Sequence, residues 1–574
     1  MRSLAGASHC LPARRNAAST KEFVVLLPNC SPIETESGET EIMANENEIA
    51  LNQAAILLRE GDDVAVAKRK IPAGTALVQE GATVTLRHDV PAGHKFALHA
   101  VQDGAPVRKY GQIIGYATAD IRTGDHVHTR NLGYGKGESG GAGALHLDYE
   151  YSTAIPEVQY YGPEQQRTFP GYARPDGRVG TRNYVALVST VNCSASTVNA
   201  IADHFRSPEA LRDFPGVDGV LPVAHKSGCG MHLGGDDYKT LQRTLGGMAD
   251  HPNVSAYLLA GLGCEVNQAL AMTQSQGLVR AAEIAFGRPQ LPPMVIIQEE
   301  GGIRKAILKG VEETVKLLKR ASEAKRTQQP ISGLIVGTNC GGSDGNSGIT
   351  ANPALGVAGD EFVRHGAGWV LAETSETYGA EHLLTRRAVT PEVGQKLVAL
   401  MRWWEWYTGM WGASIDSNPS PGNKEGGLTT IYEKSLGALA KGGSMPLVEV
   451  YKFAERIDKK GFTFMDTPGH DPVSVTGLGA GGCNLIVFTT GRGSCLGFKP
   501  SPVLKISTNT PLYNRMEEDM DLDAGVILNG VSIPDVGRQI FEALIAVAGG
   551  QKTKSEAQGL GESEFAPWML CPVM

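Results

Sequence analysis

Four cysteines follow predicted strands at short distances: Cys193, Cys229, Cys264 and Cys340. The segments before them read ALVST, VLPVA, YLLAG and LIVG, which are typical of buried strands. In an open α/β sheet the loops after the strands gather at one edge, where ligands bind. Thiolates brought there from separate strands could converge on one soft or borderline metal ion, for which iron is the obvious candidate. The alternative for each cysteine is a role as a small buried residue.

Histidine accompanies one of these cysteines in 225-HKSGCGMH-232. His225 is a candidate metal ligand, and it could instead activate the thiol of Cys229 for nucleophilic catalysis. No third, orienting residue is evident in the segment. The spacing of the cysteines is also too wide for a zinc-finger signature, so the linear sequence does not specify the site.

Other titratable side chains occur next to predicted turns. His94 and Lys95 follow a turn in PAGHK, and His126 and His128 alternate at strand period, so both face one side of a strand. We interpret that face either as a plain polar surface or as a contact with metal or substrate. Arg492 stands between glycines in 490-TGRGS-494 and could bind a carboxylate through two hydrogen bonds. It could equally be part of an ordinary surface turn.

Two loops with unusual composition need separate interpretation. The segment 417-SNPSPGNKEGG-427 has no helix or strand pattern and carries Asn423 and Lys424, and polar loops of this kind are often functional. The segment 477-GLGAGG-482 has the letters of a dinucleotide-binding loop, which must open a helix. A predicted strand, 484-NLIVFTT-490, follows it directly, so we reject a nicotinamide site.

The elements that must position these residues alternate between strand and helix after about residue 166. Strands near 184–190, 217–223, 254–260 and 294–298 alternate with helical patterns at 195–206, 238–250, 266–286 and 303–325. Such alternation predicts an α/β fold with largely parallel, Rossmann-like sheets. Short strands and PAG turns before residue 140 predict a small β-rich domain. The polar segment 321–330 indicates a boundary between two α/β domains.

The predicted organisation therefore has five parts: an extension at 1–43 that we interpret as disordered, a β-rich domain at 44–140, a linker at 141–165, and α/β domains at 166–328 and 329–574. The extension carries Arg2, Arg14 and Arg15, and an organelle transit peptide is the alternative reading. Met43 would be a plausible start of the ordered protein.

Composition excludes several classes of protein. The 574 residues include 53 Lys and Arg against 61 Asp and Glu, a formal net charge of −8, which argues against coating of nucleic acid. No apolar run approaches the roughly 20 residues that a membrane span requires. Nine cysteines without a secretory signal fit a reducing compartment, so we expect a cytoplasmic protein. Glycine supplies 71 positions, well above the usual ~7%, which indicates many tight turns.

Several longer motifs together resemble the altronate dehydratase and galactarate dehydratase family of hydro-lyases. They are DDVAVA (62–67), DVPAGHKFAL (89–98), KYGQIIGYA (109–117), GLGCE (261–265), CGGSDGNSGITANPALG (340–356), NPSPGNK (418–424) and FTTGRG (488–493). The resemblance runs from about residue 60 to the C-terminus. It implies that the β-rich domain is an SAF module.

The resemblance also implies the activity: removal of water from a sugar acid to give a 2-keto-3-deoxy acid, with ferrous iron required and Mn²⁺ as an alternative metal. Iron could be a single ion or part of an iron–sulfur cluster held by three cysteines, by analogy with other iron hydro-lyases. The matching motifs imply metal ligation by Cys229, Cys264 and Cys340 together with His126, His128 and His225. Cys193 is a further candidate ligand because of its position after a predicted strand. The motifs also imply catalytic roles for His94, Lys95 and Lys424, and substrate binding by Arg492, Ser343, Asp344 and Asn423.

The substrate is less well defined than the reaction. The altronate branch tends to read HVHxHN where this chain has Arg130 in 126-HVHTRN-131, which weakens the assignment to altronate. The histidine pair still favours D-altronate over galactarate, and another aldonate stays open. A non-catalytic sugar-acid-binding protein is the alternative from another class. As partners we expect a small anionic substrate and a second copy of the chain in a homo-oligomer, and neither nucleic acid nor membrane.

Overall fold

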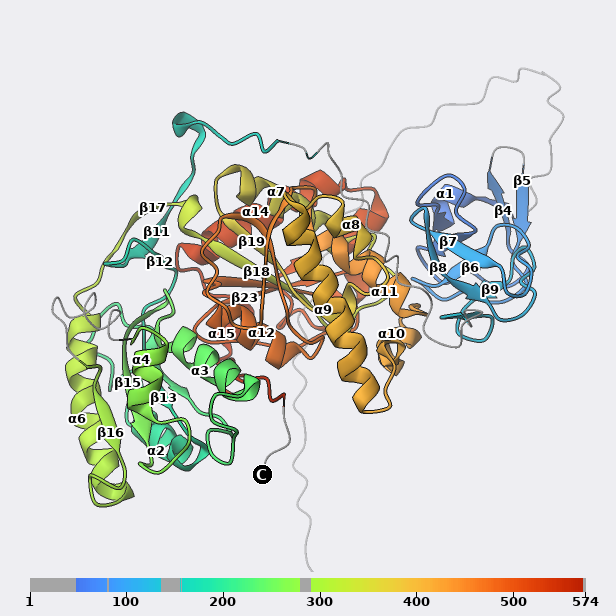
Figure 1. The fold of residues 1–574 in the computed structure, drawn as a ribbon. Coiled ribbons are helices and arrows are strands. Elements are labelled where there is room, and N and C mark those ends of the chain that lie inside the picture. The colour runs from blue at the N-terminus through green and yellow to red at the C-terminus, as the bar shows by residue number, and fades with distance from the viewer. Residues whose placement is uncertain (1–47, 80–81, 136–154, 156, 279–290, 571–574) are drawn as a thin grey trace, which may run out of the picture. The chain divides into compact units, whose positions relative to one another are not determined.

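A computed structural model describes residues 48–79, 82–135, 155, 157–278 and 291–570 (Figure 1). The extension predicted at 1–43 lies outside these residues, as does most of the linker predicted at 141–165. None of the helices in the described part of the chain is long and apolar enough to cross a membrane.

Short strands build the first domain, as predicted. They form three small sheets with the orders β1-β4-β5, β2-β3-β6-β9 and β10-β8-β7. Their bounds are β1 (Glu48–Ala50), β2 (Ala55–Ile56), β3 (Val64–Ala67), β4 (Ala76–Gln79), β5 (Ala82–Thr85), β6 (Lys95–Ala97), β7 (Pro106–Lys109), β8 (Gln112–Ala117), β9 (His126–Val127) and β10 (Leu132–Gly133), with one short helix, α1 (Leu51–Ala54). Gly74 and Gly93 end the two PAG turns with φ of +83° and +77°, a conformation that glycine adopts without strain.

The second domain contains a four-stranded parallel sheet in the order β14-β13-β15-β16. The strands are β13 (Tyr184–Ser189), β14 (Gly219–Val223), β15 (Val254–Gly261) and β16 (Met294–Ile296). They alternate with α2 (Asn192–Asp203), α3 (Asp236–Ala249), α4 (Ala269–Ser275) and α6 (Ile303–Ala321). The predicted alternation of strand and helix is confirmed, and the end of the helix expected at 266–286 lies outside the described residues.

One segment differs from the prediction. The stretch expected as a domain boundary contains β17 (Arg326–Pro330), which pairs antiparallel with β11 (Thr168–Ala173), next to β12 (Val179–Gly180). Its sequence, RTQQP, has no apolar residue because β17 is an edge strand whose side chains are mostly exposed or half-buried. A hydrophobic pattern therefore could not reveal it.

The third domain is built on a seven-stranded parallel sheet in the order β20-β21-β19-β18-β22-β23-β24. The strands are β18 (Ile335–Cys340), β19 (Gly368–Leu371), β20 (Leu447–Tyr451), β21 (Gly461–Met465), β22 (Leu485–Thr490), β23 (Val503–Ser507) and β24 (Leu522–Asp523). The helices are α7 (Ala351–Arg364), α8 (His382–Thr385), α9 (Pro391–Met410), α10 (Pro421–Glu425), α11 (Ile431–Ala438), α12 (Asp471–Ala480), α13 (Thr510–Arg515), α14 (Ile533–Ala548) and α15 (Lys554–Ala557).

The topology of this sheet marks one place for a ligand. The connection that leaves β18 runs through α7 to β19 on one side, whereas the next strand on the other side, β22, leads to β23. Neighbouring strands whose connections leave in opposite directions form a topological switch point, and a crevice opens beyond their carboxyl ends. The loops that begin at residues 341 and 491 lie at this point.

The glycines of 477–482 have a packing role. Gly477 and Gly479 lie inside α12, where an added Cβ would come within 2.6 Å of the Phe453 ring and 2.4 Å of the Phe498 ring. Close contact with these rings requires the absence of side chains. Strand β22 follows, as predicted.

A glycine also controls the contact between the first and third domains. A Cβ on Gly345 would lie 1.9 Å from the carbonyl oxygen of Gly93. We expect Gly345→Ala to lower the free energy of unfolding by about 1–3 kcal/mol or more, because backbone must move to relieve the overlap. Gly162→Ala is the control, since Gly162 has an extended φ of −68° and no atom within 4 Å of its Cβ position. Urea denaturation of both variants measures the difference, and equal stability would contradict the contact.

Candidate functional site

The turn formed by Gly341 and Gly342 directly follows β18 at the switch point. A Cβ on Gly341 would lie 2.3 Å from Oδ2 of Asp471, and a Cβ on Gly342 would lie 3.3 Å from Cβ of Arg492. The turn therefore packs against a carboxyl group and against the Cβ of a residue that bears a guanidinium group. We call it the Gly341–Gly342 turn.

Asp471 is the first residue of α12 and is only partly exposed. Burial raises the pKa of its carboxyl group to about 7, and the negative charge of Glu376 contributes in the same direction. The side-chain amide of Asn339 donates a hydrogen bond of 3.2 Å to Oδ1. A carboxyl group that titrates near neutral pH can both accept and return a proton.

Two cationic side chains belong to the rim of the site. Arg492 has a side chain 47% exposed and pairs with the exposed carboxylate of Glu425 at 3.1 Å. Exposed ion pairs of this kind contribute little free energy, so the guanidinium can exchange this partner for another carboxylate. Lys424 precedes Glu425 in α10. It is half-buried, and its Nζ makes no hydrogen bond within the described residues.

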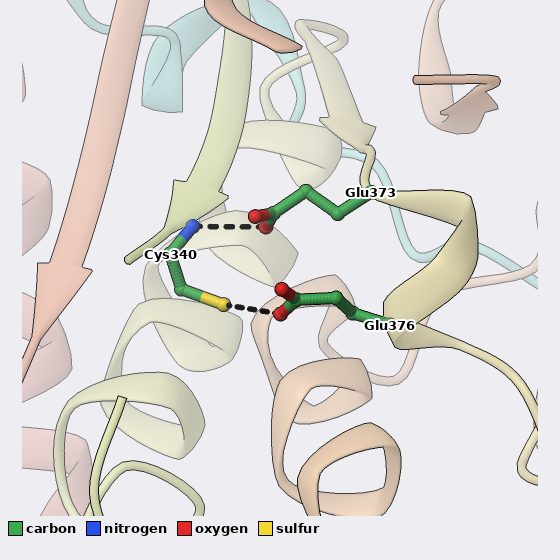
Figure 2. A group of neighbouring side chains, drawn as sticks. All are labelled: Cys340, Glu373 and Glu376. Atoms are coloured by element: carbon green, nitrogen blue, oxygen red, sulfur yellow. Dashed lines mark hydrogen bonds between the residues drawn. The ribbon is translucent and has the colours of Figure 1, made fainter. Parts of the chain in front are cut away.

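Below the turn lies a buried group of a thiol and two carboxylates (Figure 2). Cys340 ends β18, Glu373 follows β19, and Glu376 lies on the short 3₁₀ turn Thr374–Glu376. The backbone N–H of Cys340 donates to Oε2 of Glu373 at 2.8 Å, and its Sγ lies 3.4 Å from Oε2 of Glu376. Glu373 has a φ of +70°, an uncommon conformation for a residue with a side chain that marks functional sites.

Two buried lysines complete this group. Nζ of Lys441 lies 2.8 Å from Sγ of Cys340 and 2.6 Å from Oε2 of Glu373, and Nζ of Lys434 lies 2.7 Å from Oε1 of Glu376. Burial raises the pKa of the Cys340 thiol well above its ordinary value and also raises the pKa of Glu373. We call these five residues the Cys340 cluster. Burying this many ionisable groups costs free energy of folding, and such clusters are typical of functional sites.

The Cys340 cluster does not fit an iron ion in this arrangement. Its sulfur and carboxylate donors lie within 4.8 Å of one another, and Oε1 of Glu373 has no partner among the described residues. However, the ammonium group of Lys441 already contacts two of the three donors. A metal ion would have to displace this buried cation, so we derive no role for iron here. The expected ligation by Cys340 is therefore not supported.

Three histidines from the first domain form a triangle with ring centroids 5.1–5.4 Å apart: His94, His126 and His128. Nε2 of His94 and Nε2 of His128 bond the carbonyl oxygens of Glu425 and Lys424 at 3.1 and 2.8 Å. Because these nitrogens must donate, the Nδ1 atom of His94 accepts from Nε2 of His126 at 3.0 Å.

Arg130 completes the pattern by donating to Nδ1 of His126 at 2.9 Å. Burial lowers the pKa of His94 to about 4 and that of His126 to about 3, so both rings are neutral at pH 7. Nδ1 of His128 contacts the hydroxyl of Thr129 at 3.1 Å. Every ring nitrogen thus has a protein partner, and the structure does not support metal ligation by His126 and His128. The histidine triangle instead holds α10 in place through the carbonyl oxygens of Lys424 and Glu425.

Lys95 also stabilises the contact between the first and third domains. Its Nζ lies 2.8 Å from Oε2 of Glu433, and Nζ of Lys109 lies 2.9 Å from Oε1 of the same carboxylate. Both lysine side chains are 1% exposed, and Lys95 also donates to the carbonyl oxygen of Gly427. Lys95 therefore cannot contact a substrate directly in this arrangement, contrary to its expected catalytic role.

The other expected substrate-binding residues build the loop around the turn. Asp344 is buried and accepts hydrogen bonds from Ser347, Thr508 and Asn509. Asn423 caps α10 and donates to the carbonyl oxygen of Ser343 at 2.9 Å. The side chains of Asp344 and Asn423 thus make their hydrogen bonds within the protein. Only the hydroxyl of Ser343 is buried without a partner among the described residues.

The remaining cysteines belong to the second domain. Cys193, Cys229 and Cys264 are exposed and follow β13, β14 and β15. His225 is buried, with Nε2 on the carbonyl oxygen of Ser189 at 2.9 Å and Nδ1 accepting from the N–H of Ser227 at 3.1 Å. Both of its nitrogens are occupied, so His225 is neither a metal ligand nor a base for Cys229 in this arrangement.

Several site residues were missed from sequence. Glu373 and Asp471 follow β19 and β21 of the structure within six residues, which is the position type that selected the cysteines. No comparable signal marks the others, because their partners are distant in sequence: Glu376, Lys434, Lys441, Glu433 and Lys109.

Comparisons with known proteins cover nearly all of the described chain. Family models match residues 331–573 (D-galactarate/altronate dehydratase, C-terminal), 171–322 (D-galactarate dehydratase/altronate hydrolase, second domain) and 53–134 (altronate/galactarate dehydratase SAF domain). An altronate dehydratase of Bacillus subtilis (strain 168) is 35% identical, covering 88% of this chain and 97% of the relative. An altronate dehydratase of Escherichia coli (strain K12) is 35% identical, covering 87% and 96%. The galactarate dehydratase (L-threo-forming) of the same E. coli strain is 34% identical, covering 84% and 91%.

Proposed function

The chain belongs to the D-galactarate/altronate dehydratase family of hydro-lyases, and we propose that it removes water from D-altronate to give 2-dehydro-3-deoxy-D-gluconate. One observation carries the proposal. The Gly341–Gly342 turn packs against both Asp471, a carboxyl group with a pKa near neutrality, and the Cβ of Arg492, an exposed cation. Proton removal beside a carboxylate needs both a base and a cation.

Arg492 binds the substrate carboxylate in this proposal. A guanidinium group matches a carboxylate with two parallel hydrogen bonds, and the exposed carboxylate of Glu425 gives way to the substrate. Lys424 supplies a second positive charge from α10. Because negative charge moves onto the carboxylate as the C2 proton leaves, these cations stabilise the enediolate more than the bound acid.

Asp471 takes the proton from C2 in its ionised form. The electron pair of the C2–H bond is first held in the enediolate of the carboxylate. It then forms the C2=C3 double bond while the C3–O bond breaks. The hydroxyl group leaves with a proton as water, and Asp471 can return the proton it has received for this step. The enol then gains a proton at C3 and loses one from the C2 hydroxyl, which gives the 2-keto-3-deoxy acid.

Two features favour D-altronate over galactarate. The histidine pair typical of the altronate branch is present, although Arg130, which donates to His126, stands where that branch tends to have a third histidine. Arg492 also pairs with Glu425, the residue that follows Lys424 in α10, and cations linked in this way suit an acid with a single carboxylate. Galactarate has a carboxylate at each end and is the second candidate, followed by other aldonates.

Turnover of several acids tests the proposal. The protein is incubated anaerobically with D-altronate, galactarate and other aldonates, with and without ferrous iron, and 2-keto-3-deoxy products are measured. We expect the highest kcat/KM for D-altronate. A higher value for galactarate would reassign the substrate, and binding without product for every acid would favour a non-catalytic binding protein.

Arg492→Ala should raise KM for the sugar acid by about 10- to 100-fold, because a hydrogen bond to a charged group contributes roughly 1.5–3 kcal/mol. The effect on kcat should be smaller. Steady-state kinetics measure both constants. Arg538→Ala is the control, since Arg538 is 69% exposed and pairs with Asp535 on α14. An unchanged KM for Arg492→Ala would contradict carboxylate binding by Arg492.

A further inference from the structure

The second domain has a switch point of its own. The connection from β13 runs through α2 to β14 on one side, whereas β15 on the other side leads to β16. In open α/β sheets, ligands bind beyond the carboxyl ends of the strands at such a point, here β13 and β15. Cys193 and Cys264 come from the loops after these two strands, and Cys229 comes from the loop after β14. All three side chains are exposed.

Hydrogen bonds tie the three loops together within three residues of each cysteine. The N–H of Asn192 donates to the carbonyl oxygen of Ser227 at 2.8 Å, and that of Asn267 donates to Gly228 at 3.1 Å. The side-chain amide of Asn267 donates to the carbonyl oxygen of Thr190 at 2.9 Å. The loops are thus fastened to one another before any ligand binds.

The loop that carries Cys229 packs closely against β13 and the residues that follow it. Gly228 has a φ of +99°, and a Cβ there would lie 2.4 Å from the carbonyl oxygen of Thr190. His225 fastens the same loop to β13 through the carbonyl oxygen of Ser189. Only glycine permits so close an approach of the two backbones.

We propose that Cys193, Cys229 and Cys264 bind an iron–sulfur cluster, separate from the Cys340 cluster. Thiolates are the ligands of such clusters, whereas Mn²⁺ prefers oxygen. The thiolates of a cluster bind different iron atoms, so they do not need the close spacing of the ligands of a single ion.

The surroundings suit a negatively charged cluster. Cys193 is the second residue of α2, a helix of twelve residues, and the N-terminus of a helix stabilises thiolates. The side-chain amide of Gln298 donates to Sγ of Cys264 at 3.4 Å, and hydrogen bonds to sulfur tune the potential of a cluster. Oδ1 of Asn267 is buried without a partner within the described residues, which leaves an acceptor for a further group.

Three protein thiolates leave one iron of a four-iron cluster without a protein ligand. Such an iron would be a Lewis acid able to take an oxygen ligand. The site is thus suited to the ferrous iron that the family resemblance implies, while the Cys340 cluster is not.

The full-length protein, purified anaerobically, tests this inference. We expect about four iron and four acid-labile sulfide per chain, visible charge-transfer absorption, and an electron paramagnetic resonance signal after reduction. Cys193→Ser, Cys229→Ser and Cys264→Ser should each lose most of the iron, sulfide and absorption.

Cys495→Ser and Cys340→Ser are the matched controls and should retain the cluster, because Cys495 is an exposed cysteine outside the three loops and Cys340 faces Lys441. Circular dichroism of each variant shows whether it is folded. If a variant fails to fold, reconstitution of the wild type with iron and sulfide, followed by absorption, decides the result. Iron bound without sulfide, or loss of iron in Cys340→Ser alone, would overturn the proposal. Turnover is measured separately, so a cluster without dehydration would refute the proposed function and leave this site intact.

Discussion

Asp471→Asn should lower kcat for D-altronate by about 10²- to 10⁴-fold, the usual contribution of a positioned acid–base group. Asparagine has nearly the same shape and can keep the contact with Asn339, but it cannot accept the C2 proton. KM should change little, because Arg492 binds the carboxylate. Steady-state kinetics measure both constants.

Asp535→Asn is the matched control. Asp535 also lies in the first turn of a helix that has proline at its start, but it is exposed and its carboxylate contacts Ser532 and Arg538. We expect near-normal kcat in this variant. A kcat within threefold of wild type for Asp471→Asn would remove Asp471 from the mechanism.

The same carboxyl group has an effect on stability. Its pKa is 3.8 in the unfolded chain and about 7 in the folded protein, so the folded state binds the extra proton between these values. Stability therefore falls as the pH rises from about 4 to about 7. The loss is on the order of 3 to 4 kcal/mol, and Asp471→Asn should lack it. Thermal unfolding measured across this pH range tests the sign.

Glu433→Gln should lower the free energy of unfolding by about 3–5 kcal/mol, the usual effect of breaking a buried ion pair. Glu433 is fully buried and accepts from Lys95, Lys109 and Thr429. Burial alone would raise the pKa of Glu433, but the two ammonium groups hold it well below its ordinary value. Glutamine would leave both lysines buried without a counter-charge.

Because the two lysines come from β6 and β7 and Glu433 from α11, the first domain should also dock less tightly. Urea denaturation and limited proteolysis of the intact chain measure these effects. Glu542→Gln is the control, since Glu542 forms an exposed pair with Arg167 and should change stability by less than about 0.5 kcal/mol. Equal stabilities of the two variants would contradict the role of Glu433.

Much of the architecture could be predicted because buried parallel strands have strongly apolar sequences. The rule that ligands bind after such strands selected all four cysteines, whereas Arg492 is a candidate because it stands between glycines. The predicted boundary at 321–330 divides these strands between two α/β domains, which argues against convergence of all four cysteines on one metal. Cys340 follows a strand of the seven-stranded sheet, and the other three cysteines follow strands of the four-stranded sheet.

The histidines show a second kind of contact that the sequence could not predict. Their spacing correctly placed His126 and His128 near one another, and the motif raised the question of Arg130. Only the structure shows that Arg130 donates to His126 and that the carbonyl oxygens of α10 take the remaining donors. Hydrogen bonds to backbone atoms distant in sequence leave no pattern in the residues themselves.

The buried charges of the Cys340 cluster could not be predicted from the sequence for the same reason. Lys441 contacts Cys340 across 101 residues and Glu373 across 68. A buried lysine looks like any surface lysine in a sequence. The cluster could be recognised only once the fold had brought its members to the carboxyl ends of β18 and β19.

The pH dependence of kcat/KM for D-altronate tests the central claim most directly. Asp471 must be ionised to take the C2 proton, so the wild-type rate should rise with pH and level off above about pH 7. In Asp471→Asn the residual rate should lack that rise, while Asp535→Asn should keep it. A rise of the same midpoint and size in Asp471→Asn would show that another group is the base and would contradict the site described at the Gly341–Gly342 turn.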